Sequence, residues 1–137
     1  MTDRAGANLL DEVALFSSCT RTELGLLGSI TTAISVRPGT VVMTEDGPGR
    51  ECFVIAGGRA RATRDGETVA VLGPGEFFGE MSLLVGAPRA FTVVAETPME
   101  LYVISPAEFD SLLATAPSIV RKMLRERRRA EMPSFAV

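Results

Sequence analysis

Residues 75–93, GEFFGEMSLLVGAPRAFTV, combine the groups best suited to bind a small anion. Gly79 leads into a short helical turn, where a glycine lets backbone N–H groups approach an anion and the dipole of the turn adds positive charge. Arg89 is the only basic residue between positions 65 and 117, and its guanidinium can pair bidentately with a phosphate. Glu80 is out of place beside an anion unless it accepts hydrogen bonds from a sugar hydroxyl. Together these features predict a site for a ribose phosphate.

The chain has no histidine, and this absence argues against most enzyme classes. Ser-His and Cys-His catalysis, and the metal sites of cupin enzymes, normally need that side chain. Glu76 and Glu80 are four residues apart, but no second catalytic group accompanies them. The turn Gly73-Pro74-Gly75 lacks the lysine and the hydroxyl residue of a P-loop. We therefore expect a binding module that is not an enzyme, with no catalytic residue, metal or cofactor.

The middle of the chain carries short runs rich in Val, Ile and Thr, separated by glycine and proline turns. The predicted strands are Ala33–Arg37, Thr40–Thr44, Cys52–Ala56, Arg59–Arg64, Glu67–Leu72, Phe91–Glu96 and Glu100–Ser105. Strands of this length with closely spaced turns favour an antiparallel sandwich or jelly roll. Arg59 and Arg61 alternate with alanines, which predicts a solvated strand face. Contact with nucleic acid is the other interpretation of these arginines.

Two helical segments precede the strands. Residues Asn8–Phe16 have apolar side chains at helical spacing. Thr20 and Glu23 form a capping box that opens a second helix. The apolar residues of that helix are Leu24, Leu26, Leu27 and Ile30. We expect both segments to pack on the sheet and not to contact a ligand.

Two further helices follow the strands. Ser105 caps the first of them, with Pro106 at its first position. Its apolar face consists of Phe109, Leu112 and Leu113. A break at Ala116-Pro117-Ser118 starts the next helix, which is expected from about Ser118 to Glu131. The apolar face of this last helix consists of Ile119, Val120, Met123 and Leu124.

Length and composition indicate one soluble globular domain. With 137 residues, of which 46% are hydrophobic and 23% charged, the chain is large enough for one core and too small for two. Cys19 and Cys52 have no CxxC spacing, so we expect free thiols in a reducing cytoplasm. The sequence contains no apolar run long enough to span a membrane and no signal peptide pattern. We expect a cytoplasmic monomer or weak dimer.

The segment FGEMSLLVGAPRAFTV resembles the phosphate-binding cassette of cyclic nucleotide-binding domains, as in catabolite activator proteins and the regulatory subunits of cyclic nucleotide-dependent protein kinases. That cassette reads approximately FGE, an aliphatic residue, Ala or Ser, Leu, and then Pro-Arg-x-Ala-Thr-Val. The matching residues are Phe78, Gly79, Glu80, Ser82, Leu83, Pro88, Arg89, Thr92 and Val93. Phe91 departs from the pattern, since the family usually has alanine there.

The resemblance covers about Leu9 to Arg129 and implies a mainly β fold. This fold is an antiparallel jelly roll, or double-stranded β-helix as in cupins, with flanking helices. It implies one domain over residues 1–137. The expected parts are a helical lead-in at 1–32, the jelly roll at 33–105 with the cassette at 75–93, helices at 106–131 and a tail at 132–137.

The resemblance also implies a role for each cassette residue. Gly79 allows close approach of the backbone to the ligand. Glu80 accepts a hydrogen bond from the ribose 2′-hydroxyl, and Arg89 pairs with the phosphate oxygens. Met81 and Ser82 present backbone N–H groups to the phosphate. These five residues form the expected phosphate and ribose site.

Four more residues are expected at the ligand. Ala90 adds a backbone N–H group, and because a threonine at this position favours cGMP in the family, alanine favours cAMP over cGMP. Val69 and Leu72 are expected apolar walls for the base. Phe91 lies beside the phosphate, and a ring that fills this pocket would prevent binding.

The resemblance implies a regulatory module that senses cAMP and relays binding through its last helix to an effector protein or domain. The alternative is a degenerate domain that keeps the fold, binds no cyclic nucleotide and serves in protein interaction. Phe91 is the residue that could decide for this alternative. Because the sequence has no kinase, channel or transferase segment, we expect the module to act on a separate partner or to belong to a longer chain.

The last helix concentrates positive charge. Residues 1–120 contain 8 basic and 15 acidic side chains, whereas residues 121–131 contain 6 basic and 2 acidic ones. A solvated face on a docked helix is the simplest interpretation. The resemblance implies a second one, a lid in which an arginine stacks on the base. Contact with nucleic acid or an anionic membrane is the third, which we disfavour because Pro133 ends the segment and no helix-turn-helix follows.

Overall fold

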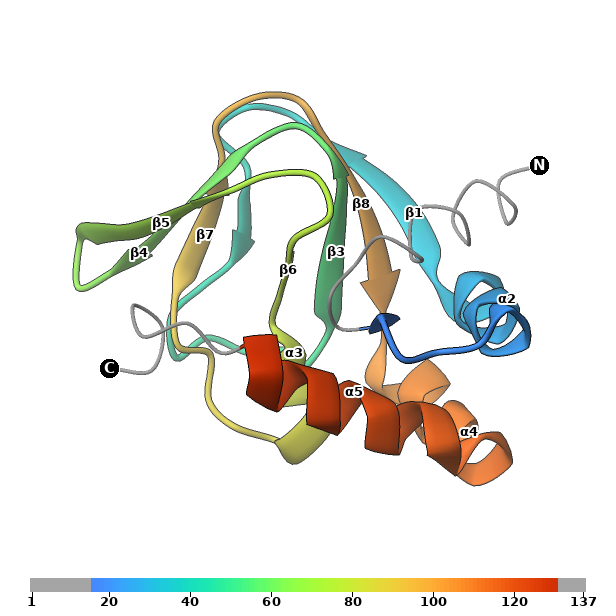
Figure 1. Cartoon of the computed structure of the whole chain (residues 1–137). Helices are drawn as coiled ribbons and strands as arrows, with labels where there is room; N and C mark the ends of the chain where they lie inside the picture. Colours follow the sequence, from blue (N-terminus) through green and yellow to red (C-terminus); the bar gives the residue numbers. More distant parts are fainter. Residues whose placement is uncertain (1–15, 131–137) are drawn as a thin grey trace.

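The structure, a computed structural model, describes the backbone of residues 16–130 and the side chains of residues 16–125 (Figure 1). In this part of the chain, eight strands form two four-stranded antiparallel sheets, and the helices gather at one end of the resulting roll. The jelly roll predicted from the sequence is confirmed. The predicted helix at Asn8–Phe16, except for Phe16, and the tail at 132–137 lie outside the described residues.

The strands follow the predicted positions closely. They are β1 (Thr32–Val36), β2 (Val41–Met43), β3 (Cys52–Gly57), β4 (Ala60–Arg64), β5 (Glu67–Leu72), β6 (Phe77–Phe78), β7 (Thr92–Ala95) and β8 (Met99–Ile104). One sheet has the order β1-β8-β3-β6 and the other the order β2-β7-β4-β5. Only β6 was not predicted, because two residues among glycines carry no periodicity. It forms by pairing Phe78 with Phe53 and Phe77 with Val54.

The described helices are α2 (Arg21–Ile30), α3 (Glu80–Val85), α4 (Pro106–Thr115) and α5 (Pro117–Ala130). Both predicted caps are confirmed, and each belongs to a capping box. Thr20 Oγ1 accepts from the backbone N–H of Glu23 at 3.1 Å, and Ser105 Oγ accepts from that of Glu108 at 3.2 Å. These side chains satisfy N–H groups that the first helical turn leaves without partners.

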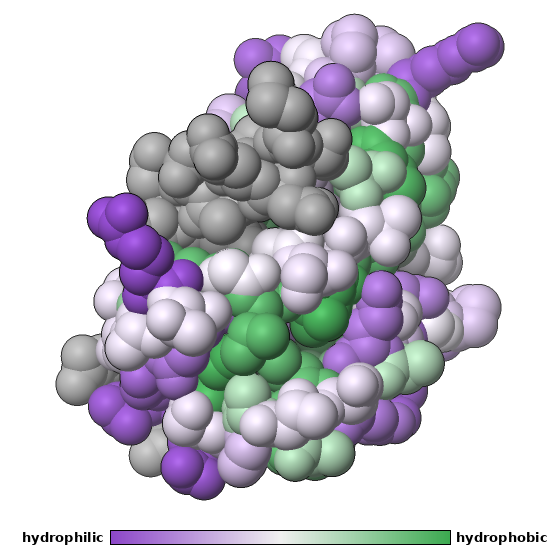
Figure 2. All heavy atoms as spheres, turned by 90° about the vertical axis from the view of Figure 1, so that its right-hand side faces the viewer, coloured by the Kyte–Doolittle hydropathy of each residue, from purple (hydrophilic) through white to green (hydrophobic). Residues whose placement is uncertain are grey.

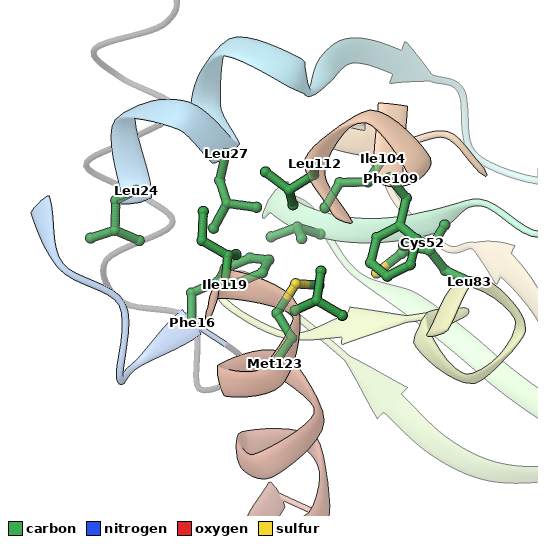
Figure 3. Packing of buried hydrophobic residues seen from close by; sticks show 12 residues of the cluster. Phe16, Leu24, Leu27, Cys52, Leu83, Ile104, Phe109, Leu112, Ile119 and Met123 are labelled. Atoms are coloured by element: carbon green, nitrogen blue, oxygen red, sulfur yellow. The ribbon is translucent and has the colours of Figure 1, made fainter. Parts of the chain in front are cut away.

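The core consists of two hydrophobic clusters, and strand β3 contributes side chains to both of them. Because side chains alternate along a strand, Phe53 and Ile55 face the other sheet while Cys52 and Val54 face the helices. The helical cluster also includes residues of α2, α3, α4 and α5 and is drawn in Figure 3. Its buried members are Phe16, Leu24, Leu27, Cys52, Val54, Leu83, Ile104, Phe109, Leu112, Ile119, Val120 and Met123. The cassette helix and the last helix therefore pack into one core.

Three leucines assigned to apolar helix faces are exposed. Leu26, Leu113 and Leu124 have exposed fractions of 44%, 47% and 37%, so these parts of the prediction are wrong. Successive residues on a helix are rotated by about 100°, and the adjacent buried residue takes the inward direction in each case. Apolar residues also reach the surface on the side of the molecule that Figure 2 turns toward the viewer.

Candidate functional site

Gly79 lies where the cassette turns from β6 into α3. It has a φ of +81°, in the left-handed region that glycine adopts without strain. A Cβ atom here would lie 2.6 Å from the carbonyl oxygen of Glu51 and 2.8 Å from Nη1 of Arg89. Both the conformation and the space therefore require glycine. The first N–H groups of an α-helix have no acceptor within the helix, and no side chain among the described residues caps those of α3.

Arg89 is the buried cation of the site, with only 3% of its surface exposed. Nη1 donates to the carbonyl oxygens of Glu51 at 2.7 Å and Gly79 at 3.4 Å, and Nη2 pairs with Oε1 of Glu51 at 3.1 Å. Nε is buried and has no hydrogen-bond partner in the described part of the chain. Burial lowers the pKa of the Arg89 guanidinium, and the Glu51 carboxylate opposes this shift. Arg89 is thus a buried cation whose Nε–H has no acceptor among the described residues.

Glu51 is the site residue that sequence reasoning missed. It lies directly before β3, 38 residues away from Arg89, and its side chain is 40% exposed. It binds Arg89 through both its carbonyl and its carboxylate. A carboxylate in a loop carries no pattern that would identify its distant partner, and its only signal is its place at the start of a predicted buried strand.

The C-terminal end of α3 is held by side chains as well as by backbone. Nε of Arg50 donates to the carbonyl oxygen of Ser82 at 3.2 Å. The hydroxyl of Ser82 donates to the carbonyl oxygen of Ala87 at 2.8 Å and so stabilises the loop after the helix. Gly86 ends α3 in the left-handed conformation. Because the Ser82 hydroxyl is engaged in this way, the predicted contribution of Ser82 to a ligand falls to its backbone N–H group.

Glu80 and Met81 are the first two residues of α3, and both are half-buried. Cys52 lies close enough for the charge of Glu80 to act on it. Burial is the main cause that raises the pKa of the Cys52 thiol, and the carboxylate of Glu80 adds to the rise. Cys19 and Cys52 are not part of a disulfide, as predicted, and Cys52 is completely buried.

The other four residues expected at the ligand, which are Val69, Leu72, Ala90 and Phe91, lie along or next to the sheet β2-β7-β4-β5. Leu72 is buried in the cluster between the sheets, and Val69 and Phe91 are partly buried against it. The guanidinium carbon of Arg64 lies 4.7 Å from the centre of the Phe91 ring. Ala90 is exposed, and its carbonyl oxygen accepts a long hydrogen bond of 3.4 Å from Nε of Arg64. These residues lie on one sheet, while Arg89 contacts Glu51 and Gly79, which flank β3 and β6 of the other sheet.

Arg59 and Arg61 lie on the solvated face of the same sheet, as predicted, with side chains that are 57% and 44% exposed. Both pair with Glu96, at 3.0 Å from Nε of Arg59 and 2.7 Å from Nε of Arg61. These hydrogen bonds, first that from Arg59 and then that from Arg61, lower the pKa of Glu96. The cluster is a surface ion-pair group.

The described residues offer neither a metal site nor a membrane span. No three of their Cys, Asp and Glu side chains gather closely enough to hold a metal ion. None of their helices is long and apolar enough to cross a bilayer. Among the described residues, the buried guanidinium of Arg89 in the cassette is therefore the best candidate to bind a ligand.

A family model described as "Cyclic nucleotide-binding domain" matches residues 33–116 of the chain. The chain belongs to this family. It is 33% identical over 117 residues to a cAMP-dependent protein kinase regulatory subunit of Pyricularia oryzae. The alignment covers 84% of this chain and 30% of that protein, so this cyclic nucleotide-binding domain spans about a third of that relative's length.

Two solved structures resemble this cyclic nucleotide-binding domain. A cyclic nucleotide-binding domain from Methylobacillus flagellatus has a TM-score of 0.79 and 26% identity, covering 93% of this chain and 74% of that one. The catabolite activator protein of Thermus thermophilus has a TM-score of 0.76 and 28% identity, covering 85% of this chain and 57% of that one. The resemblance inferred from the cassette sequence is confirmed.

In this cyclic nucleotide-binding domain, Glu23 ties the last helix to the first described one. Its Oε1 accepts from Nζ of Lys122 at 2.6 Å, and its Oε2 accepts from the hydroxyl of Ser118 at 2.8 Å. Oε1 also accepts from the backbone N–H of Thr20 in the capping box. The bond from Lys122, followed by that from Thr20, lowers the pKa of Glu23 to about 2. One carboxylate thus caps α2 and holds the first turns of α5.

Proposed function

We propose that this domain binds cAMP as a regulatory effector, at the site formed by Gly79 and Arg89. The observation that carries the proposal is the buried Arg89 guanidinium, whose Nε has no partner among the described residues. Burying an N–H group without an acceptor costs about 1–3 kcal/mol. The cyclic phosphate of cAMP is an anion with acceptor oxygens, so pairing with Arg89 recovers this cost and adds a charge-assisted bond.

The backbone around Gly79 supports the same proposal. The N–H groups at the start of α3, which include those of Met81 and Ser82, have no acceptor within the helix. The glycine lets the chain turn into α3 directly beside the Arg89 guanidinium, so that these N–H groups and the cation are neighbours. Glu80 is the first residue of α3, where its carboxylate can accept from a ribose hydroxyl. We therefore assign the phosphate to Arg89 and the first turn of α3, and the ribose 2′-hydroxyl to Glu80.

Two observations support cAMP in preference to cGMP. Ala90 has no hydroxyl group that could hydrogen-bond a guanine, whereas threonine at this position favours cGMP in the family. The Pyricularia oryzae relative is described as a cAMP-dependent protein kinase regulatory subunit. The effector protein or domain of this chain is a separate question, because the similarity covers only 30% of that relative.

We further propose that binding is relayed through α5. Leu83 of the cassette helix belongs to the same buried cluster as Ile119 and Met123 of α5 (Figure 3). Cores are closely packed, so a shift of α3 on binding changes the contacts available to α5. A ligand biases two states only by its differential affinity for them. The relay therefore requires two conformations of the cassette. The conformation that binds cAMP better must also favour a different placement of α5.

Titration calorimetry with cAMP, cGMP and 5′-AMP tests the proposed function. We expect saturable binding of cAMP, weaker binding of cGMP, and much weaker binding of 5′-AMP, whose phosphate lacks the ring constraint. Arg61→Ala is the matched control, because it removes an arginine of the same domain from the outer face. Failure of wild type to bind any cyclic nucleotide would contradict the proposal.

A second function, a degenerate domain that serves in protein interaction, also has one observation in its favour. The carboxylate of Glu51 already pairs with Arg89 at 3.1 Å, so the buried charge has an internal counterion. Titration of Glu51→Gln separates the two functions. If Arg89 binds a phosphate, removing the competing charge strengthens or preserves cAMP binding. If the pair is purely structural, neither protein binds cAMP and Glu51→Gln is only less stable.

A further inference from the structure

Arg64 and Phe91 lie opposite each other at the cassette end of the roll. Strands β4 and β7 pair antiparallel with Thr63 opposite Thr92, so the register brings Arg64 next to Phe91. Ala62 and Val93, two residues away on the same strands, are buried between the sheets. Because side chains alternate along a strand, Arg64 and Phe91 extend the inner face of the sheet.

The two side chains form a cation–π contact. Cζ of Arg64 lies 4.7 Å from the centre of the Phe91 ring, well within the range of such contacts. Nε of Arg64 is directed at the carbonyl oxygen of Ala90 at 3.4 Å. The Phe91 ring itself packs against the cluster between the sheets. The guanidinium is thus supported by a ring that the core holds in place.

This pair lies next to the proposed nucleotide site. Ala90 and Phe91 directly follow Arg89, the residue assigned to the phosphate. In a cyclic nucleotide the base is separated from the phosphate only by the ribose. Val69 and Leu72, the expected walls for the base, pack into the same cluster as Phe91. The expected walls for the base and the Arg64–Phe91 pair therefore belong to one group of side chains on the sheet β2-β7-β4-β5.

We propose that the purine base of the bound cyclic nucleotide stacks on the guanidinium of Arg64, with Phe91 supporting Arg64 from the opposite side. This inference rests on the proposed function, because it needs a cyclic nucleotide at Arg89. Guanidinium planes and aromatic rings are the surfaces on which proteins stack bases. Phe91, which stands where the family usually has alanine, then acts as a positioning residue for Arg64.

Stacking has a different selectivity from recognition of a base edge. An arginine that bonds a base edge selects guanine, whose O6 and N7 both accept hydrogen bonds. An arginine that stacks accepts either purine, because both present a similar π-face. We therefore expect Arg64 to increase affinity for cAMP and cGMP alike and to contribute less for the smaller ring of cCMP.

Calorimetric titration of the full chain with cAMP, cGMP, cCMP and a base-free ribose 3′,5′-cyclic phosphate tests this role. Arg64→Gln is expected to weaken cAMP and cGMP binding by about tenfold, the size of a desolvated cation–π contact. The base-free ligand should lose less than about twofold. Arg64→Lys keeps the charge without the plane and should recover only part of the loss. Phe91→Ala should weaken cAMP by about threefold to fivefold through loss of support for Arg64.

The controls separate base stacking from charge and from folding. Arg61→Gln removes an arginine from the outer face of the same strand and should leave all affinities unchanged. Thermal unfolding of each variant checks that the fold is retained. Equal weakening of cAMP and the base-free ligand, or full recovery by Arg64→Lys, would overturn the stacking role. A loss confined to cGMP would also overturn it, in favour of an edge contact. If wild type binds none of these ligands, the proposed function itself fails. If wild type binds them and Arg64→Gln weakens cAMP no more than the base-free ligand, only the stacking role fails.

Discussion

Two arginine–glutamate groups in this domain share their chemistry and differ in burial. The side chain of Arg89 is 2% exposed beside Glu51, whereas Arg59 and Arg61 are largely exposed and share Glu96. Water screens the outer group, so it contributes little to stability. The cost of removing a buried guanidinium from water is offset only if each of its N–H groups has an acceptor. Nε of Arg89 has none among the described residues. A buried arginine with a spare donor is a poor stabiliser and a good anion ligand, which is how we interpret it.

The largest expected effect is that of Arg89→Ala. This change should weaken cAMP binding by about 2–5 kcal/mol, because it removes the buried cation that we assign to the phosphate. Titration calorimetry measures the loss, and Arg89→Lys, which keeps the charge, serves as a check on folding. Unchanged cAMP affinity in a folded Arg89→Ala protein would show that the phosphate does not bind here.

Glu80→Ala should have the next largest effect. The loss of a hydrogen bond between the carboxylate and the ribose 2′-hydroxyl is expected to cost about 1.5–3 kcal/mol in cAMP affinity. The ligand 2′-deoxy-cAMP should bind wild type correspondingly less well and should lose little further on Glu80→Ala. Additive losses from the two changes would mean that Glu80 and the 2′-hydroxyl do not contact each other.

Binding at the buried arginine should also change the last helix, whereas the outer arginine group should not respond. We expect coupling of about 1–3 kcal/mol, since Leu83 and Met123 share one core. Amide hydrogen exchange with and without cAMP measures this response. Protection should change in residues 79–89 and in α5, and remain constant around Arg59. A response confined to the cassette would leave α5 as a passive end of the fold.

Glu23 and its partner Lys122 form a third ion pair, whose exposure lies between that of Arg89 and that of the outer arginines. The pKa of Glu23 is lowered from 4.5 to about 2 in the folded protein, so its stabilising contribution is complete above the unfolded value and is lost as pH falls toward 2. Glu23→Gln should therefore be less stable than wild type by about 1.5 kcal/mol at neutral pH, the lower range for bonds to charged groups. Urea unfolding should show this gap shrinking between about pH 5 and pH 2. A gap independent of pH would mean that the glutamate acts without its charge.

Arg61→Ala should have the smallest effect. Exposed ion pairs contribute little, and Arg59 remains beside Glu96 in this variant. We expect both the free energy of unfolding and the cAMP affinity to stay within about 0.5 kcal/mol of wild type. Chemical unfolding and calorimetry check the two quantities. A large loss of cAMP affinity would mean that the outer face communicates with the site, contrary to the comparison above.

Local sequence patterns predicted most elements of this fold. Strand ends were correct to within one residue because glycine and proline turns mark them, and both caps were correct because each depends on residues only three apart. The two-residue strand β6 lacked any such local signal. The exposed leucines Leu26, Leu113 and Leu124 were misassigned, since periodicity alone does not decide which of two adjacent apolar residues points inward.

Contacts between distant residues could not be predicted in the same way. Glu51 meets Arg89 across 38 residues, and Glu23 meets Lys122 across 99, with no pattern linking either pair. The candidate ligand residues of the cassette could be proposed from the sequence, because its glycine, carboxylate and arginine fall within one short stretch. Arg64 and Phe91 required the register of β4 and β7, which only the folded sheet provides.

The burial of Cys52 gives the domain an internal reporter of its own opening. Its thiol is completely enclosed by the core that Leu83 and α5 share, and burial raises its pKa, so the reactive thiolate does not form in the closed state. An alkylating reagent can modify Cys52 only during local unfolding of the surrounding helices or cassette. The rate at which Cys52 is modified therefore reports local unfolding of these helices or the cassette, and the protein needs no added label for this measurement.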